Sequence, residues 1–301
     1  MERKIFSIAP SFNCSLKCSG CYLTEGVTRE MRDLTKSDYY WARAMEEAVR
    51  HGYEEFAMTL NPFPGATEKA LKYAKMARAK GFKFINVTAT LQAVFIYESD
   101  EFVPFAQELL NQVDVLSISV DEHRFKDSFD MRHQLSDFDD ELENINFYGR
   151  GKILNINLLW TPTVFEWFFE QNLDEKVDNI IEWRDEGDTS GITFQHLILK
   201  PLSLYPSHEW LYKNYQDVVN TSKNIKIQGN NGNQIGDAAF HNMLGMNQCP
   251  GKMMVDIDPM GFARKCPENP EAYDATTIAK LQEIFVSGVP NCGSSKCNCI
   301  L

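Results

Sequence analysis

The stretch Cys14-Ser-Leu-Lys-Cys18-Ser-Gly-Cys21 comes shortly after an apolar run, Ile5–Ala9, that has the composition of a β-strand. Three thiolates on one tight loop can bind three irons of a [4Fe–4S] cluster and leave the fourth iron open to another ligand. Zinc is an alternative, but it requires a fourth Cys or His close by, and no histidine lies within 25 residues of Cys21. Three unrelated core thiols are the other alternative. The spacing therefore favours an iron–sulfur cluster with one open iron.

The eight cysteines of the 301-residue chain form two groups. No cysteine occurs between Cys21 and Cys249, and the last fifth of the chain contains Cys249, Cys266, Cys292, Cys297 and Cys299. Grouped cysteines in a reducing compartment indicate metal binding rather than disulfides. We therefore predict two separate metal sites, one for each group.

The composition is that of a globular protein, with 44% apolar and 24% charged residues, which excludes wholesale disorder. No apolar run approaches the roughly 18 residues of a transmembrane helix. The start of the chain, Met1–Lys4, leads into too few apolar residues for a secretory signal. We expect a cytoplasmic protein without a membrane partner. With 42 acidic and 30 basic residues, the net charge of −12 argues against general nucleic-acid binding.

The middle of the sequence alternates between short β-rich runs and amphipathic helical segments. Several runs are apolar on both faces, as the strands of a covered parallel sheet are. The predicted strands are Ile5–Ala9, Glu55–Leu60, Phe82–Ala89, Val115–Val120, Ile153–Leu159 and Ile192–Leu199. Six strand–helix units predict an α/β fold, an open, partial (β/α)6 barrel of the TIM type, with its functional residues at the carboxyl ends of the strands.

The helices between these strands have recognisable ends. Thr35 is expected to cap a helix that ends at Gly52, and Thr67 to start a helix that ends at Gly81. Further helices are predicted near Val103–Gln112, Leu173–Asp185 and His208–Asn220.

The chain divides into a long first part and a short cysteine-bearing end. Residues 1–223 are assigned to the barrel, and residues 224–248, which are polar and glycine-rich, to a linker or loop. Residues 249–301 are expected to form a small C-terminal domain. Within it, Val255–Ile257 and Phe262–Arg264 are joined by a Pro-Met-Gly turn, which predicts a β-hairpin that brings two of the cysteines together.

The CxxxCxxC motif after the first strand resembles that of the radical S-adenosylmethionine (SAM) superfamily, and the strand–helix alternation over roughly residues 4–220 agrees. The resemblance implies that Cys14, Cys18 and Cys21 are the catalytic cluster ligands and that SAM chelates the open iron. It also implies that reduction of the cluster cleaves SAM to methionine and a 5′-deoxyadenosyl radical, which abstracts a hydrogen atom from the substrate.

Other positions resemble the SAM-binding motifs of the family less evenly. The end of the second strand, Thr59-Leu60-Asn61-Pro62, has Asn61 where the family usually has the Glu of Gly-Gly-Glu-Pro. The fourth strand ends in Ser119-Val-Asp121, similar to a Ser-x-Asp strand end near the SAM ribose. Phe129–Arg132 resembles a motif whose arginine pairs with the methionine carboxylate, a task that suits a guanidinium. The residues expected to contact SAM are Tyr22, Asn61, Thr88, Ser119, Asp121, Arg132 and Asn157.

Structural roles are the alternatives for several of these residues. Ser119 has the alternative of a strand-end hydroxyl, and Arg132 that of a solvated helix charge. The family often has an aromatic residue over the adenine just before the third cysteine, where this chain has Gly20. Tyr22 follows that cysteine, and the backbone of the loop can still contact adenine. Thr88 and Asn157 are polar residues of strands three and five, and such residues also occur at sheet edges that bind nothing.

The hairpin between Cys249 and Cys266 resembles the auxiliary-cluster region of the SPASM and shorter twitch radical SAM enzymes. A full SPASM domain carries more cysteines for its pair of auxiliary clusters, so the resemblance implies a single auxiliary [4Fe–4S] cluster, as in the twitch type. Its expected ligands are Cys249, Cys266 and Cys292, with either Cys297 or Cys299 as the fourth. A cluster that keeps an open iron is the alternative to a fourth cysteine. Structural zinc is the alternative.

An auxiliary cluster can accept an electron from a substrate radical or position the substrate. Because the cysteine motif begins at residue 14, we expect no N-terminal peptide-recognition domain, which favours oxidation or rearrangement of a small molecule. A maturase that modifies a ribosomal peptide or protein side chain is one alternative, and a non-catalytic zinc or iron–sulfur structural or sensing protein is another. The expected partner is an electron donor such as flavodoxin or ferredoxin. His196 lies near the end of the sixth strand, where strand histidines are more often structural than functional.

Overall fold

The structure is a computed structural model, and it describes residues 4–15, 26–59, 61, 63, 65–90, 108–120, 153–160, 191–198, 254–265 and 271–289. For residues 67, 89, 90, 118–120, 153–160 and 191–198, the backbone is described without the side chains. The described residues fall into two compact units. One contains the residues up to Asp114 together with residues 254–289, and the other contains residues 115–198.

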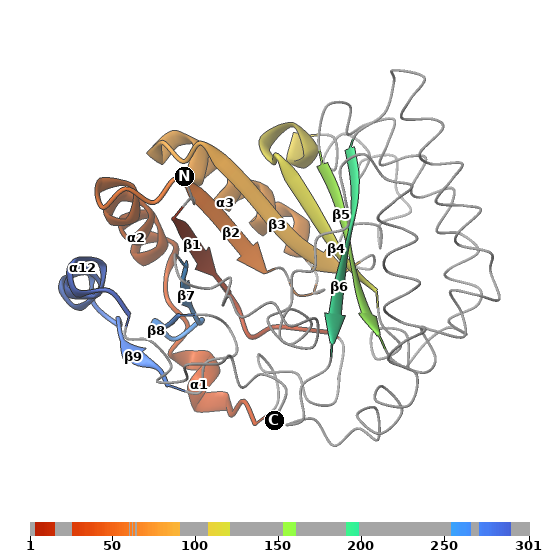
Figure 1. The fold of residues 1–301 in the computed structure, drawn as a ribbon. Coiled ribbons are helices and arrows are strands. Elements are labelled where there is room, and N and C mark those ends of the chain that lie inside the picture. Colours follow the sequence, from red (N-terminus) through yellow and green to blue (C-terminus); the bar gives the residue numbers. More distant parts are fainter. Residues whose placement is uncertain are drawn as a thin grey trace. The chain divides into compact units, whose positions relative to one another are not determined.

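The strands of the first unit lie in the order β3-β2-β1-β7-β8-β9 (Figure 1). They are β1 (Ile5–Ile8), β2 (Glu55–Thr59), β3 (Phe84–Thr90), β7 (Met254–Ile257), β8 (Phe262–Arg264) and β9 (Tyr273–Asp274). β1 pairs in parallel with β2 on one side and with β7 on the other, and β2 pairs in parallel with β3. β8 and β9 continue the order as antiparallel neighbours. The C-terminal hairpin therefore extends the sheet next to the strand that precedes the cysteine motif.

The helices of this unit are α1 (Arg29–Asp33), α2 (Asp38–Arg50), α3 (Ala66–Lys80) and α12 (Ile278–Ser287), and residues 108–112 are helical too. α2 lies between α3 and α12 (Figure 1). Thr277 caps the start of α12, and its hydroxyl accepts a hydrogen bond from the backbone amide of Lys280. None of the helices in the described ranges is long and apolar enough to span a bilayer.

Two predicted helix starts are wrong by a few residues. Ser37, not Thr35, caps α2, and its hydroxyl accepts a hydrogen bond from the amide of Tyr40 at 3.4 Å. The amide of Lys36 donates a hydrogen bond to the carbonyl of Pro259, which holds the chain before Ser37 outside the helix. α3 begins at Ala66 after a left-handed Gly65, which leaves Thr67 inside the first turn. The predicted end at Gly81, with φ of 104°, is confirmed.

An aromatic cluster fills the space between the sheet and the helices. Phe6 of β1 stacks on Phe82 with ring centroids 6.1 Å apart and meets Phe285 of α12 edge-on at 5.9 Å. Tyr53 lies 4.9 Å from Phe285 and 6.4 Å from Phe6. All four rings are at most 8% exposed, so their burial fixes α12 against β1 through the hydrophobic effect.

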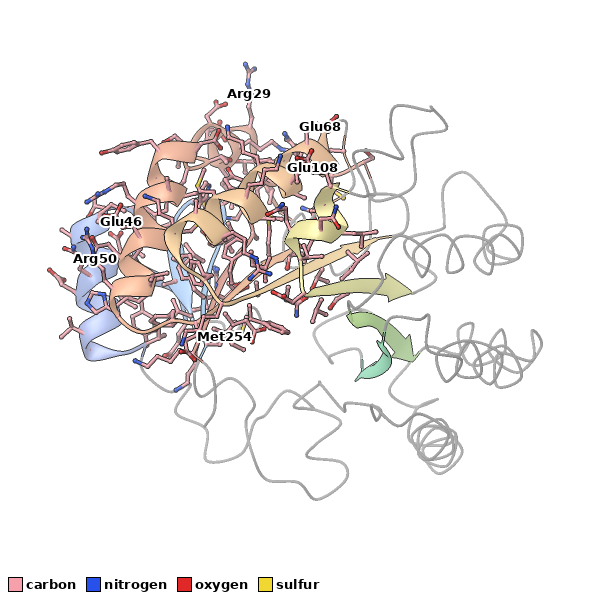
Figure 2. The ribbon with its side chains drawn as sticks, turned by 90° about the horizontal axis from the view of Figure 1, so that it is seen from above. Arg29, Glu46, Arg50, Glu68, Glu108 and Met254 are labelled. Carbon is pink, nitrogen blue, oxygen red and sulfur yellow. The ribbon has the colours of Figure 1, made fainter. Side chains whose placement is uncertain are left out.

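The outer surface of α2 carries a network of ion pairs. Glu46 and Arg50 lie next to each other on this helix (Figure 2) and form an ion pair one turn apart. Glu46 also pairs with Lys80 of α3 at 3.1 Å, while Arg50 pairs with the buried Glu47 at 2.6 Å. These pairs attach α2 to α3 and keep the Glu47 carboxylate compensated.

The second unit contains β4 (Val115–Val120), β5 (Ile153–Trp160) and β6 (Gly191–Ile198). β4 pairs in parallel with β5, and β5 in parallel with β6. All six strands that the sequence predicted for the barrel are therefore present, each within two residues of its predicted ends. The α/β class is confirmed, with β1, β2 and β3 in chain order in one unit and β4, β5 and β6 in the other.

Candidate functional site

The segment that contains the first cysteine leaves the sheet at the carboxyl end of β1. Residues 9–15 follow the strand, with Ala9 and Phe12 buried and Cys14 partly exposed. Because β1, β2, β3 and β7 run parallel, their carboxyl ends share one edge of the sheet. Cys14 therefore follows β1 at the edge where the sequence predicted the functional residues.

Polar contacts from the loop after β2 and from α3 hold the backbone of this segment. The side-chain amide of Asn61 donates a hydrogen bond to the carbonyl of Ser11 at 3.3 Å. The ammonium of Lys69, whose pKa burial lowers, donates to the carbonyl of Pro10 at 3.4 Å. Asn61, predicted as a SAM contact, therefore lies beside the chain just before Cys14 and holds the backbone there.

The C-terminal hairpin contacts the same segment at both of its ends. The backbone amide of Ala9 donates to the carbonyl of Ile257 at 2.9 Å, which extends the pairing of β1 with β7. Farther along the chain, the amide of Lys36 donates to the carbonyl of Pro259 at 2.8 Å. The predicted hairpin is confirmed, and its position beside β1 adds a contact that the sequence analysis did not foresee.

A buried carboxyl group lies on the opposite face of the sheet from the aromatic cluster. Asp256 of β7 is paired in register with Ser7 of β1, and the alternation of strand residues places both opposite Phe6. Burial raises the pKa of Asp256 to about 6, and the charge of Asp258 acts in the same direction. The hydrogen bond with Ser7 and the charge of Arg264 oppose this shift. Sequence reasoning missed Asp256, although an acid within an apolar strand was a usable signal.

Thr88 occupies the same edge in β3. The β2–β3 register pairs it with Thr59, two residues before Asn61, and its side chain is partly exposed. Among the predicted SAM contacts, the structure therefore places Asn61 and Thr88 at the carboxyl edge of one parallel sheet, the edge that β1 leaves toward Cys14. Hydroxyl and amide groups there can donate and accept hydrogen bonds.

In the second unit, the strand register aligns polar positions in two rows. The rows are Ser117–Asn155–Thr193 and Ser119–Asn157–Gln195. Because partners in a row and every second residue along a strand share a face, both rows belong to one face of this sheet. Ser119 and Asn157, both predicted as SAM contacts, are thus direct neighbours in register. His196 pairs in register with Leu158, on the alternate positions of these strands.

The remaining predicted site residues lie outside the described residues. They are Cys18, Cys21, Tyr22, Asp121, Arg132, Cys249, Cys266, Cys292, Cys297 and Cys299. Among the residues that the structure does describe, no group of three or more His, Cys, Asp or Glu side chains could hold a metal ion. Both proposed cluster sites depend on cysteines beyond this part of the chain.

Comparison with known proteins gives matches to solved structures alone. No family model matches the chain, and no curated protein matches it. A structure titled "Native anSMEcpe with bound AdoMet" is similar with a TM-score of 0.51, 15% identity and coverage of 93% of this chain and 80% of its own. The chain therefore shares the fold of this AdoMet-bound structure.

Two further solved structures are similar to the chain with lower scores. A histidine-tagged form of anSMEcpe with bound AdoMet gives a TM-score of 0.48 at 14% identity, over 94% of this chain and 80% of the other. "Crystal structure of methylornithine synthase (PylB)" gives 0.42 at 12% identity, over 95% and 83%. At 15% identity the likeness to the first of these structures concerns the fold, and the chemistry of this chain is a separate proposal.

Proposed function

We propose that this chain is a radical SAM enzyme whose Cys14, Cys18 and Cys21 hold a [4Fe–4S] cluster. The observation that carries the proposal is the position of Cys14. It follows β1 at the carboxyl edge of the parallel strands, in a chain whose fold is similar to that of a structure with bound AdoMet. Three thiolates suit an iron–sulfur cluster with an open iron, so the donor set fits the group.

When bound, the cluster supplies the electron that cleaves SAM into methionine and a 5′-deoxyadenosyl radical. The residues of this chain bind and orient SAM. Asn61 and Lys69 hold the backbone before Cys14 through hydrogen bonds of 3.3 and 3.4 Å. Holding reacting groups in a fixed geometry lowers the entropy cost of reaching the transition state. We assign SAM contacts to Tyr22, Asn61, Thr88, Ser119, Asp121, Arg132 and Asn157.

We also propose that residues 249–301 bind one auxiliary [4Fe–4S] cluster of the twitch type. The hairpin supports this assignment, because the register of Asp256 with Arg264 brings its two ends together. Met254 and Lys265, the described residues nearest to Cys249 and Cys266, lie at the same end of the hairpin. Cys292 and one of Cys297 and Cys299 complete the proposed ligand set. In this division, residues 1–223 contribute the barrel and residues 224–248 the linker.

The proposed reaction is oxidation or rearrangement of a small molecule in the cytoplasm, with flavodoxin or ferredoxin as electron donor. The two polar rows of the second unit support an uncharged, hydrogen-bonding ligand, because their residues are Ser, Thr, Asn and Gln. A peptide substrate is the competing outcome, and it would be detected as a mass loss or cross-link in a candidate precursor.

Anaerobic reconstitution tests the proposal. With iron and sulfide, the protein should turn brown and bind about eight irons, as two [4Fe–4S] clusters require. Under dithionite, it should convert SAM to 5′-deoxyadenosine, measured by liquid chromatography. Stoichiometric zinc without cleavage of SAM would rule out the radical mechanism and favour a structural or sensing protein.

A further inference from the structure

One turn of the structure is bonded to the chain on both sides of the cysteine motif. The turn connects β7 to β8 and consists of residues 258–261, with Ile257 directly before it. Ala9, before the motif, donates to the carbonyl of Ile257 at 2.9 Å, and Lys36, after it, donates to the carbonyl of Pro259 at 2.8 Å. The segment from Ala9 to Lys36, which we call the cysteine segment, contains all of Cys14, Cys18 and Cys21. One end of this segment is therefore bonded to the carbonyl directly before Asp258, and the other end to the carbonyl of Pro259 directly after it.

Asp258 fixes the shape of this turn. One oxygen of its carboxylate, Oδ1, accepts hydrogen bonds from the backbone amides of Met260 and Phe262, each at 3.0 Å. The other oxygen, Oδ2, accepts from the guanidinium of Arg264 at 2.9 Å. The residue is 6% exposed, so these bonds form away from water, where losing one is costly.

The turn also packs tightly against the end of the cysteine segment. Gly261 has a φ of +87°, and a Cβ at this position would lie 2.6 Å from Cε of Lys36 and 3.2 Å from Cα of Thr276. The carbonyl of Gly261 accepts from the amide of Ala275 at 3.0 Å. In turn, the carbonyl of Ala275 accepts from the hydroxyl of Tyr40 in α2 at 2.6 Å. The turn is thus held in place by the helix that follows the cysteine segment.

We propose that Asp258 is a positioning residue for SAM binding, because it fixes the turn to which both ends of the cysteine segment are bonded. The inference rests on the proposed function. A segment with fixed ends samples fewer conformations than a free one, so the chain that carries the cluster ligands loses less entropy when SAM binds to the cluster. Asp258 belongs to the C-terminal hairpin, so the chain around the proposed auxiliary site also shapes the SAM site.

The test compares three variants after anaerobic reconstitution. Asp258→Ala removes every contact of the carboxylate, and Asp258→Asn keeps an oxygen for the two turn amides but loses the charge facing Arg264. Asp274→Ala is the matched control. Asp274 also accepts from a nearby amide, that of Thr276 at 2.9 Å, and pairs with Lys280, but it bonds to nothing in the described part of the cysteine segment. The readout is the change that SAM causes in the electron paramagnetic resonance spectrum of the reduced cluster, titrated with SAM.

We expect the SAM concentration at half-saturation to rise about tenfold in Asp258→Ala and about threefold in Asp258→Asn. Asp274→Ala should match the wild type, even where its melting temperature falls. Bound iron in Asp258→Asn should stay at the wild-type level, which separates positioning from loss of the cluster.

Each outcome is decisive. Equal half-saturation in the wild type and Asp258→Asn, or an equal rise in Asp274→Ala, overturns the inference. If Asp258→Ala does not fold, the Asn variant alone decides. A wild-type protein whose cluster shows no response to SAM contradicts the proposed function itself, which is a different result from an unresponsive variant series.

Discussion

Ser7 of β1 and Asp256 of β7 occupy the same register position of two parallel strands, and the Ser7 hydroxyl donates a hydrogen bond to the Asp256 carboxyl. The two residues are 3% and 5% exposed. Arg264 and Asp258 are the charged groups that act on this carboxyl, the first lowering and the second raising its pKa. The pair joins the first strand of the sheet to the C-terminal hairpin through a group whose charge depends on pH.

This pair predicts a specific dependence of stability on pH. Burial raises the pKa of Asp256 to about 6 from an ordinary value of 3.8. Between these values the folded chain keeps a proton that the unfolded chain has released, so the contribution of Asp256 to stability falls as pH rises from about 4 to about 6. Asp256→Asn should therefore be as stable as the wild type at pH 4 and more stable at pH 8, by on the order of 3 kcal/mol.

Urea denaturation at the two pH values measures this difference. Asp274→Asn is the control, because hydrogen bonds with Lys280 and Thr276 lower the pKa of that exposed carboxyl instead. Its stability relative to the wild type should fall slightly, not rise, between pH 4 and pH 8. A gap between Asp256→Asn and the wild type that is the same at both pH values would contradict the prediction.

Arg78 anchors α3 to neighbouring parts of the chain, and we predict that a lysine at this position would lower stability. Its guanidinium donates to the carbonyls of Gln112 at 3.1 Å and Lys83 at 2.9 Å, and it pairs with Asp114. The Asp114 carboxylate also accepts from the amide of Ile85 at 2.8 Å. A lysine ammonium cannot reach these acceptors in the same plane. We expect Arg78→Lys to lower the free energy of unfolding by about 1–2 kcal/mol.

The control for Arg78 lies on the same helix. Lys75 forms an ion pair with Glu108, and both side chains are almost half exposed. Lys75→Ala should change the free energy of unfolding by less than about 0.5 kcal/mol, since exposed pairs contribute little. Equal losses of unfolding free energy in Arg78→Lys and Lys75→Ala would show that the three contacts of the Arg78 guanidinium do not contribute to stability.

The buried ring of Phe285 attaches α12 to the sheet, and its removal tests how strong that attachment is. Its ring contacts Phe6, Tyr53 and His51, with centroids between 4.9 and 5.9 Å apart. Phe285→Ala should cost about 3–4 kcal/mol by leaving a cavity between helix and sheet. Val286, the next residue, is 78% exposed, and Val286→Ala should be nearly neutral in the same urea titration. A loss below about 1 kcal/mol for Phe285→Ala would mean that α12 contributes little to the unit.

The sequence predicted the strands well because their signal is local. Val115–Val120 was predicted with the observed bounds, and the hairpin turn was identified from Pro259-Met-Gly261. α1, α12 and β9 were missed. In α12 the apolar face formed by Leu281, Ile284 and Phe285 is short, and β9 has only two residues. Patterns of that length do not differ from loop sequences.

The position of the hairpin could not be predicted, since it depends on pairing across most of the chain. Phe6 and Val255 share a register position, but nothing within the apolar run of either strand identifies the other as its neighbour. Asn61 illustrates the same limit at the site. Its place at the end of β2 was predicted from the strand pattern, whereas its bond to the carbonyl of Ser11 follows from how β2 lies beside β1.

The two groups of cysteines predict separable losses of iron. The triple variant Cys14→Ala, Cys18→Ala, Cys21→Ala should lose cleavage of SAM and keep about four irons, because the proposed auxiliary cluster has its own ligands. The double variant Cys249→Ala, Cys266→Ala is the matched control, and it should lose the auxiliary irons while still forming 5′-deoxyadenosine. Iron content and 5′-deoxyadenosine yield are measured on the same reconstituted samples. If the triple variant retained no iron, or the double variant lost both SAM cleavage and all iron, the two groups of cysteines would form one shared site. With two independent clusters, replacing the ligands of one leaves the ligands of the other in place.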